Sequence, residues 1–218
     1  MHRRLVTIIL GIALGLAATL LATRVTAIRL TGNHQGYEPV QPIAYSHRLH
    51  AGDLQIPCLY CHSAAESSRH AGIPTATTCM NCHRFVTTTF GAMKAEDDAA
   101  TKERRKPRLI VSAELQKVYN ALALDPASMR PAPGRTPSAI AWTKVHGLPA
   151  FVNFEHRGHV RVGIACQQCH GPIETMERVR QFEVLSMGFC VNCHRQMNET
   201  GVGGRRVNAS IDCITCHY

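Results

Sequence analysis

The ten cysteines of this 218-residue chain all belong to one repeated pattern. In each copy, two cysteines are separated by two residues and are followed at once by a histidine. The five copies lie at residues 58–62, 79–83, 166–170, 190–194 and 213–217. Cys-x-x-Cys-His is the attachment motif of c-type haem, because two thiols on one turn can bond to both vinyl groups of a porphyrin while the histidine binds the iron. The pattern predicts five covalently attached haem c groups.

The motif gives each of its residues a role. The cysteines expected to bind haem covalently are Cys58, Cys61, Cys79, Cys82, Cys166, Cys169, Cys190, Cys193, Cys213 and Cys216. The histidines expected to be proximal iron ligands are His62, His83, His170, His194 and His217.

Zinc binding and thiol redox chemistry are the main alternatives. Two Cys-x-x-Cys pairs can build a zinc site, and one pair can act as a thioredoxin-like dithiol. Neither use requires a histidine at the next position, and histidine is only 13 of the 218 residues. Five such histidines therefore favour haem.

Eight further histidines lie outside the motifs and could supply the sixth ligand of each iron. We expect His2 to lie on the cytoplasmic side of an N-terminal anchor and His34, in a stretch rich in Gly and Asn, to face solvent. An aromatic-x-His-x-x-His element occurs at residues 45–50 and again at 154–159, each time before two haem motifs. Residues 45–84 and 154–195 are therefore two copies of a di-haem unit.

In each unit, the first histidine of this element is expected to cap its own unit's first haem, while the second can reach another haem nearby. The distal ligands predicted in this way are His47, His50, His156 and His159. His70 and His146 compete for the fifth iron, so one candidate is surplus. Most or all of the irons would be bis-histidine ligated, which leaves no open position for a substrate.

The N-terminus has an apolar run from Leu5 to Thr23, preceded by Arg3 and Arg4. About 20 apolar residues span a bilayer, so this run predicts one transmembrane helix. A cleavable signal peptide has a similar pattern, and residues 25–27 form an acceptable cleavage site, but the apolar run is longer than the usual signal. Because haem attaches covalently outside the cytoplasm, we expect a single-pass protein of the cell (inner) membrane with its haem region on the periplasmic side.

The remaining chain divides by composition and motifs. We expect an anchor at 1–26, a first di-haem module at 27–92, a haem-free charged and Pro-rich insertion at 93–144, and a tri-haem module at 145–218. In the insertion, residues 93–108 are charged and expected to be a mobile, solvated segment. Residues 112–124 predict one short helix with Ser112 as its N-cap and with Leu115, Val118, Tyr119 and Leu122 as its apolar stripe.

The formal net charge of +9 does not indicate nucleic acid binding here. Haem propionates would offset much of the charge, and arginine pairs well with carboxylates. Because the non-membrane part is lean in apolar residues, porphyrins are expected to replace much of the hydrophobic core. The predicted fold class is a multihaem cytochrome c, with mostly short α-helices and loops around five covalent haems, one N-terminal transmembrane helix and little or no β-sheet.

Several segments between the haem motifs resemble the pentahaem, membrane-anchored cytochrome c subunit of alternative complex III, a quinol:electron acceptor oxidoreductase. The resemblance runs from about residue 1 to 217 and rests on residues 46–52, 69–74, 79–83, 145–149, 154–160 and 187–190. It implies partner subunits: an iron–sulfur/molybdopterin-like subunit, polytopic quinol-binding subunits and a monohaem cytochrome c. It also implies that the histidines of both aromatic-x-His-x-x-His elements are axial ligands.

The leading hypothesis is therefore an electron-transfer subunit, not catalytic alone, that relays electrons from quinol oxidation to a cytochrome c, a cupredoxin or a terminal oxidase in a respiratory or photosynthetic membrane. The second hypothesis is a stand-alone membrane-anchored multihaem quinol dehydrogenase that feeds a periplasmic reductase. The third, a multihaem reductase acting on a small oxyanion, requires a haem with a vacant face, and the surplus of histidines argues against it.

Overall fold

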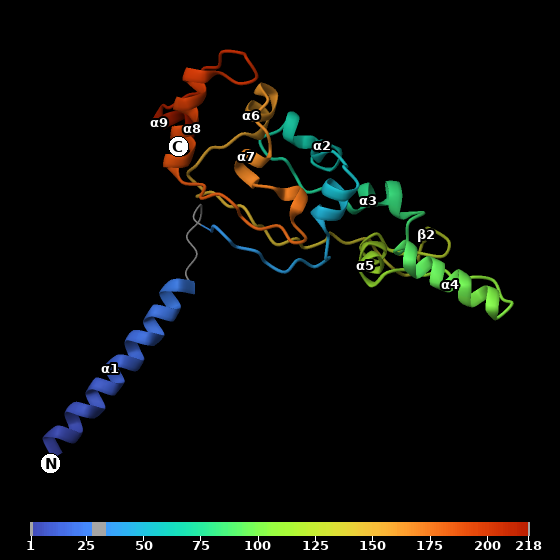
Figure 1. Ribbon diagram of the computed structural model, residues 1–218, viewed down its shortest axis with the longest axis horizontal. Helices are drawn as coiled ribbons and strands as arrows, with labels where there is room; N and C mark the ends of the chain where they lie inside the picture. Colours follow the sequence, from blue (N-terminus) through green and yellow to red (C-terminus); the bar gives the residue numbers. More distant parts are fainter. Residues whose placement is uncertain (1, 28–33, 218) are drawn as a thin grey trace.

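The computed structural model describes residues 2–27 and 34–217, and in the first helix it describes the side chains of residues 4–22 (Figure 1). The expected start of the first di-haem module, at residues 28–33, lies outside the described residues. Helix α1 (His2–Ala27) contains a stretch, Arg4–Ala22, that is long and apolar enough to cross a membrane. None of this stretch is buried inside the protein, so its leucines and isoleucines are free to contact lipid.

The rest of the described chain is mostly short helices and loops, as the sequence predicts. The first half contains η1 (Arg48–Asp53), α2 (Cys58–Cys61), η2 (Ser63–Glu66) and α3 (Ala76–His83). The insertion contains α4 (Phe90–Lys102), α5 (Ala113–Ala121) and the antiparallel pair β1 (Leu124–Asp125) and β2 (Arg130–Pro131), in which Leu124 lies opposite Pro131. The second half contains α6 (His156–Val162), α7 (Gln167–His170), η3 (Ile173–Thr175), α8 (Met187–Thr200) and α9 (Cys213–Cys216).

The two halves that repeat in sequence cross over in space. Element η1 of the first half packs on η3 of the second, and α6 of the second half packs on η2 of the first. The backbone hydrogen bonds correspond: Arg48 N donates to Met176 O over 2.9 Å, and Arg157 N donates to Ser68 O over 3.2 Å. Both acceptors lie six residues beyond the first motif histidine of the opposite half. The repeat is therefore a pair of interlocked units with approximate two-fold symmetry.

A glycine makes one of these contacts possible. A Cβ atom at Gly52, in η1, would overlap the backbone carbonyl of Glu174 in η3. Any larger residue would push η1 away from the opposite half.

The prediction of one short helix in the insertion is half right. Helix α5 forms with Ser112 as its N-cap, whose side chain accepts a hydrogen bond from Leu115 N, as predicted. The charged segment before it, expected to be mobile, contributes a second helix, α4. Thr89 caps this helix by accepting a hydrogen bond from Ala92 N, and Lys94 pairs with Asp98 one turn on.

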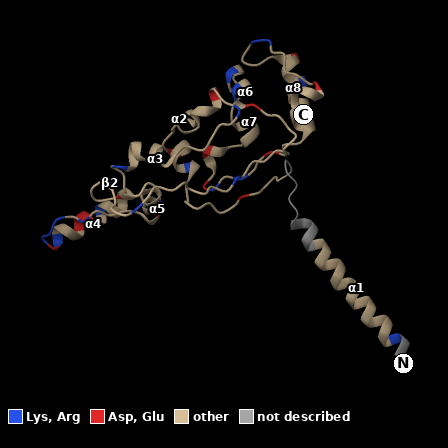
Figure 2. Cartoon of the chain, turned by 180° about the vertical axis from the view of Figure 1, so that it is seen from behind, with Lys and Arg blue, Asp and Glu red and all other residues tan. Residues whose placement is uncertain are grey.

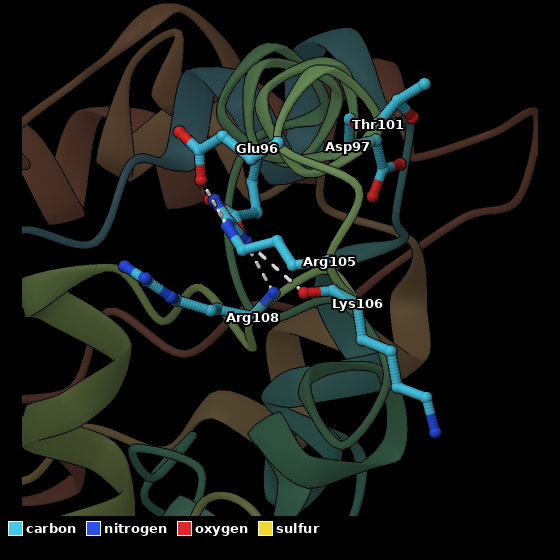
Figure 3. Close-up of polar contacts among 7 residues, drawn as sticks. Glu96, Asp97, Thr101, Arg105, Lys106 and Arg108 are labelled. Carbon is cyan, nitrogen blue, oxygen red and sulfur yellow. Dashed lines mark hydrogen bonds and ion pairs between the residues drawn. The ribbon is translucent and has the colours of Figure 1, made fainter.

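A polar clamp holds the loop that follows α4 (Figure 3). Glu96 on α4 pairs with the Arg105 guanidinium and accepts a hydrogen bond from Arg108 N over 2.8 Å. Arg105 also pairs with Glu103. Lys and Arg residues of this loop gather at the outer end of α4, away from the rest of the body (Figure 2).

The main apolar cluster lies where the insertion meets the first half. Tyr119 and Val118 of α5 pack with Met80 of α3 and with Ile43, and Trp142 packs against the cluster from the side. The apolar stripe predicted for α5 therefore packs against the first half of the chain. Tyr119 is fully buried and its hydroxyl donates to His83 O over 2.6 Å, which ties the insertion to the second haem motif.

Candidate haem-binding sites

Each of the five motifs lies on a single helical turn. The cysteines of two motifs delimit the four-residue helices α2 and α9, one motif ends at the end of α3, one begins at the N-cap of α7, and one lies inside α8. One turn places both sulfur atoms of a motif on the same side of the helix. The ten cysteines, all within the described residues, form no disulfide, and four of them are exposed while the others are partly buried. This arrangement fits two thioether bonds to one porphyrin at each motif.

The histidines are held in the form that binds iron. The Nδ1 atoms of three motif histidines, His62, His83 and His194, lie 2.7, 2.7 and 2.5 Å from backbone carbonyl oxygens. A carbonyl oxygen accepts a hydrogen bond only from a nitrogen that carries a proton. The proton of each ring is therefore on Nδ1, and the lone pair of Nε2 is available to bind a metal. Three predicted distal ligands follow the same rule, with Nδ1 to carbonyl distances of 2.8–2.9 Å: His50, His156 and His159.

Three pairs of histidine rings are separated by the distance that a shared iron requires. Metal–nitrogen bonds of about 2 Å place two opposed imidazole centroids roughly 6 Å apart. The observed centroid distances are 6.1 Å for His50–His83 and 5.9 Å for His159–His194. The rings of His156 and His170 lie 6.4 Å apart and nearly parallel.

The aromatic residue of each repeated element braces both of its histidines. Tyr45 stacks on His50 at 4.4 Å and meets His47 edge-on at 4.9 Å. In the second half, Phe154 packs on His159 at 4.7 Å and meets His156 edge-on at 4.9 Å. The aromatic residue in the sequence pattern therefore orients the two rings, and it does so in the same way in both halves.

A histidine cluster lies between the first and third motifs. Burial, reinforced by the charges of neighbouring histidines, lowers the pKa of His170 and the pKa of His47 to about 4. Both rings are therefore neutral at physiological pH, as iron ligation requires. The Nδ1 atom of His47 is buried with no hydrogen-bond partner among the described residues, unlike the Nδ1 atoms of His50, His156 and His159.

The two candidates for the fifth distal ligand differ in position. His146 is partly buried, and its ring centroid lies 4.5 Å from that of His170. His70 is exposed, and none of the ring contacts among the described residues involves it. The structure thus brings His146, but not His70, into the histidine cluster.

His34 differs from the expectation that it faces solvent. It is half-buried against Tyr37, and its Nε2 atom is buried without a hydrogen-bond partner among the described residues. The polar stretch around it gives no signal of burial, and this stretch pairs with a segment far along the chain: Gly36 N donates to Gln181 O over 2.7 Å.

The motif cysteines and histidines do not gather into a smaller metal site. Among the residues that the structure describes, no three His, Cys, Asp or Glu side chains lie close enough to hold one metal ion between them. Three motif histidines instead pair with a second histidine at the ring spacing that one shared iron requires, and each of these motifs also carries two cysteines for attachment. The residues present therefore fit haem c.

Comparison with known proteins gives the same chemistry. Residues 152–218 match the family described as cytochrome c7 and related cytochrome c. The chain is also 24% identical over 199 residues to "Menaquinone reductase, multiheme cytochrome c subunit" of Nitratidesulfovibrio vulgaris, a match that covers 81% of this chain and 76% of the relative. Both matches support one class of protein, the multihaem cytochromes c. Covalently bound haem c and a role in electron transport follow from that class.

Proposed function

We propose that this multihaem cytochrome is the pentahaem electron-relay subunit of a membrane-bound quinol-oxidising complex of the alternative complex III type. The observation that carries the proposal is the set of three histidine pairs, each joining a motif histidine to a distal histidine at the spacing of a six-coordinate iron. Six-coordinate irons suit electron relay, because a substrate would need an open position. Haem c would supply a reversible one-electron change between ferric and ferrous iron.

The chain's own residues attach, orient and shield the five haems. The motif cysteines would hold each porphyrin, and the motif histidines would bind its iron from one side. His47, His50, His156 and His159 would bind from the other side, with His70 or His146 as the fifth distal ligand; Nε2 of His146 lies 3.3 Å from Nδ1 of His170. Carbonyl oxygens on Nδ1 fix the ring orientations and increase the basicity of the ligands.

Helix α1 would anchor the subunit in the membrane, with the haem region on the periplasmic side where haem is attached. An anchored relay requires partners at both ends. On the quinol side we expect polytopic membrane subunits and an iron–sulfur/molybdopterin-like subunit. On the acceptor side we expect a monohaem cytochrome c, and beyond it a soluble cytochrome c, a cupredoxin or a terminal oxidase.

A second candidate function runs in the opposite direction. The relative from Nitratidesulfovibrio vulgaris is named as a subunit of a menaquinone reductase, so a chain of this kind can serve a complex that delivers electrons to quinone. A stand-alone quinol dehydrogenase feeding a periplasmic reductase is a third arrangement with the same haem chemistry. The three differ in subunit composition and in the direction of electron flow.

Purification from the native membrane in mild detergent tests the proposal. We expect mass spectrometry to identify polytopic and iron–sulfur/molybdopterin-like subunits in the same complex, and an added quinol to reduce the haems within it. Electron paramagnetic resonance (EPR) of the oxidised complex should show only low-spin haem from this chain. A chain that purifies alone and oxidises quinol would support the stand-alone dehydrogenase, and a high-spin haem with a vacant face would support the reductase.

A further inference from the structure

The five haem motifs do not follow one another in space as they do in sequence. We propose that they form a single row in the order 79–83, 58–62, 166–170, 190–194, 213–217, so that the second and the fifth motifs of the sequence hold the terminal haems. This inference rests on the proposed function, because it assumes a haem at every motif. It adds to that function the path along which electrons pass.

The second motif lies beside the first. Asn81, between the cysteines of the second motif, donates from Nδ2 to the Tyr60 hydroxyl of the first over 3.0 Å. Element η1 joins both motifs. His50 opposes His83 of the second motif, and Ile56 N, just before the first motif, donates to His50 O over 2.9 Å.

The first motif lies beside the third, where the two halves cross over. Backbone hydrogen bonds join the segments around these two motifs: Arg48 N donates to Met176 O over 2.9 Å, and Arg157 N donates to Ser68 O over 3.2 Å. The loop after each motif binds the opposite half, through η1 on η3 and α6 on η2. These two motifs therefore lie on either side of the approximate two-fold axis and form the centre of the row.

The third motif lies beside the fourth, as the symmetry requires. Helix α6 carries two histidines three residues apart, like the pair at η1. His156 opposes His170 of the third motif at 6.4 Å, and His159 opposes His194 of the fourth at 5.9 Å. The contacts in the two halves together give the order second motif, first motif, third motif and fourth motif.

The fifth motif extends the row beyond the fourth. The segment that leads into α9 lies along α8, where Asn198 exchanges two hydrogen bonds with the backbone of Ala209, at 2.9 and 2.6 Å. The Nδ1 atom of His194 lies 2.5 Å from Ser210 O in the same segment. The fifth motif begins shortly afterwards at Cys213.

The two ends of the row have different surroundings. The end at the second motif meets the insertion, where Tyr119 binds His83 O. At the end with the fifth motif, Asn153 N donates to Cys216 O over 2.8 Å, while Ile214 between the cysteines is 89% exposed. Figure 1 shows α8 and α9 at one end of the body and α3 to α5 at the other. Partners that deliver and accept electrons would dock at these ends.

Electron transfer along this row needs no other reactant than the quinol and the acceptor of the proposed function. One electron passes between neighbouring motifs at each step, so one iron is oxidised as the next is reduced, and no bond forms or breaks. The sequence order of the first two motifs is reversed in the path.

Anomalous X-ray scattering at the iron edge, measured on crystals of the purified full chain or its complex, tests the order directly. We expect five iron positions, with the iron of the motif at 58–62 between those of the motifs at 79–83 and 166–170. An iron of the motif at 79–83 lying between the other two would overturn the inference while leaving the proposed function intact. Fewer than five irons, with an intact mass that agrees, would contradict the proposed function itself.

Two matched variants test the same order in solution through EPR, because neighbouring ferric irons broaden each other's signals. The variant C79S/C82S removes a terminal haem and should sharpen the signal of one remaining haem. The variant C58S/C61S removes an internal haem and should sharpen the signals of two remaining haems. The reverse result, two signals for C79S/C82S and one for C58S/C61S, would contradict the proposed row. The intact mass must first show four haems in each variant. If either variant fails to fold, the iron positions measured by anomalous scattering in the unaltered chain decide the order.

Discussion

The insertion and the C-terminal haem region are built in different ways. Among the described residues of the insertion, Ala100, Val118, Tyr119 and Ala123 are buried, and an ion-pair clamp fixes the loop after α4. In the described part of the C-terminal region, from His146 to His217, the only buried residues other than glycine are Met176 and the polar Gln181. A polypeptide core holds the first region, and the second has almost none.

The difference shows what fills the space in a multihaem protein. A chain segment with so little buried apolar surface cannot offset the entropy of ordering its backbone. Its short helices are held at defined positions by histidine rings and by hydrogen bonds across the two halves. Porphyrins between the opposed histidines would supply the missing apolar contacts, so folding of this region should depend on haem attachment.

The largest expected effect is therefore the loss of haem itself. In a variant with all ten cysteines changed to serine, we expect the haem region to lose its protection against amide hydrogen exchange, while α5 keeps more protection than α6 to α9. Hydrogen exchange followed by mass spectrometry, with the haem-loaded chain as control, measures both. A cooperative, compact fold in the haem-free chain would contradict the claim that folding of the haem region depends on haem attachment.

The next largest effect concerns the core that the insertion does have. Tyr119→Ala should destabilise the haem-loaded chain by about 3–5 kcal/mol, because it empties a fully buried site. Tyr119→Phe is the matched control. It keeps the ring and loses only the hydrogen bond to His83 O, at a cost of about 1 kcal/mol. Denaturant unfolding measures both variants, and equal costs would contradict the burial of this ring.

A smaller effect is expected at the helix caps of the insertion. Ser112→Ala removes the side-chain oxygen that accepts from Leu115 N, and should cost about 1 kcal/mol. Ser112→Asp keeps an acceptor at the N-cap and should restore most of this stability. If the alanine variant were as stable as the original chain in denaturant unfolding, the cap would have no role in holding α5.

The smallest effect is a pH dependence at the clamp. The hydrogen bond from the Arg105 guanidinium, with help from Arg108 N, lowers the pKa of Glu96 to about 2. An unfolded glutamate has a pKa of about 4.3, so the stabilisation is complete above that pH and is lost as the pH falls towards about 2. Glu96→Gln should lower stability at neutral pH and remove this part of the acid dependence. If the free energy of unfolding changed by the same amount between these pH values in both proteins, the assignment would be contradicted.

The local features of this fold could be predicted from the sequence, and the long-range ones could not. The haem motifs, the Ser112 cap and the stripe on α5 depend on residues a few positions apart. Helix α4 was missed because its charges resemble a solvated segment, although its alanines favour a helix. The crossover joins residues more than 80 positions apart, such as Arg157 and Ser68, and no local pattern encodes it.

The candidate site shows the same division between local features, which the sequence predicts, and long-range features, which it does not. The repeated aromatic-x-His-x-x-His element predicts four candidate iron ligands, and three of these histidines lie at the ring spacing that a shared iron would require. The choice between His70 and His146, the burial of His34 and the spatial order of the motifs all depend on how the two halves interlock. These needed the three-dimensional arrangement.

The central claim is that five tetrapyrroles are bound through ten thioether bonds. The intact mass of the purified chain under denaturing conditions, combined with its pyridine haemochrome spectrum, tests this most directly. The account predicts a polypeptide heavier by five haem masses, with no free thiol to react with an alkylating reagent. Cysteines that alkylate freely, or a mass that matches the bare chain with disulfides or a zinc ion, would contradict it.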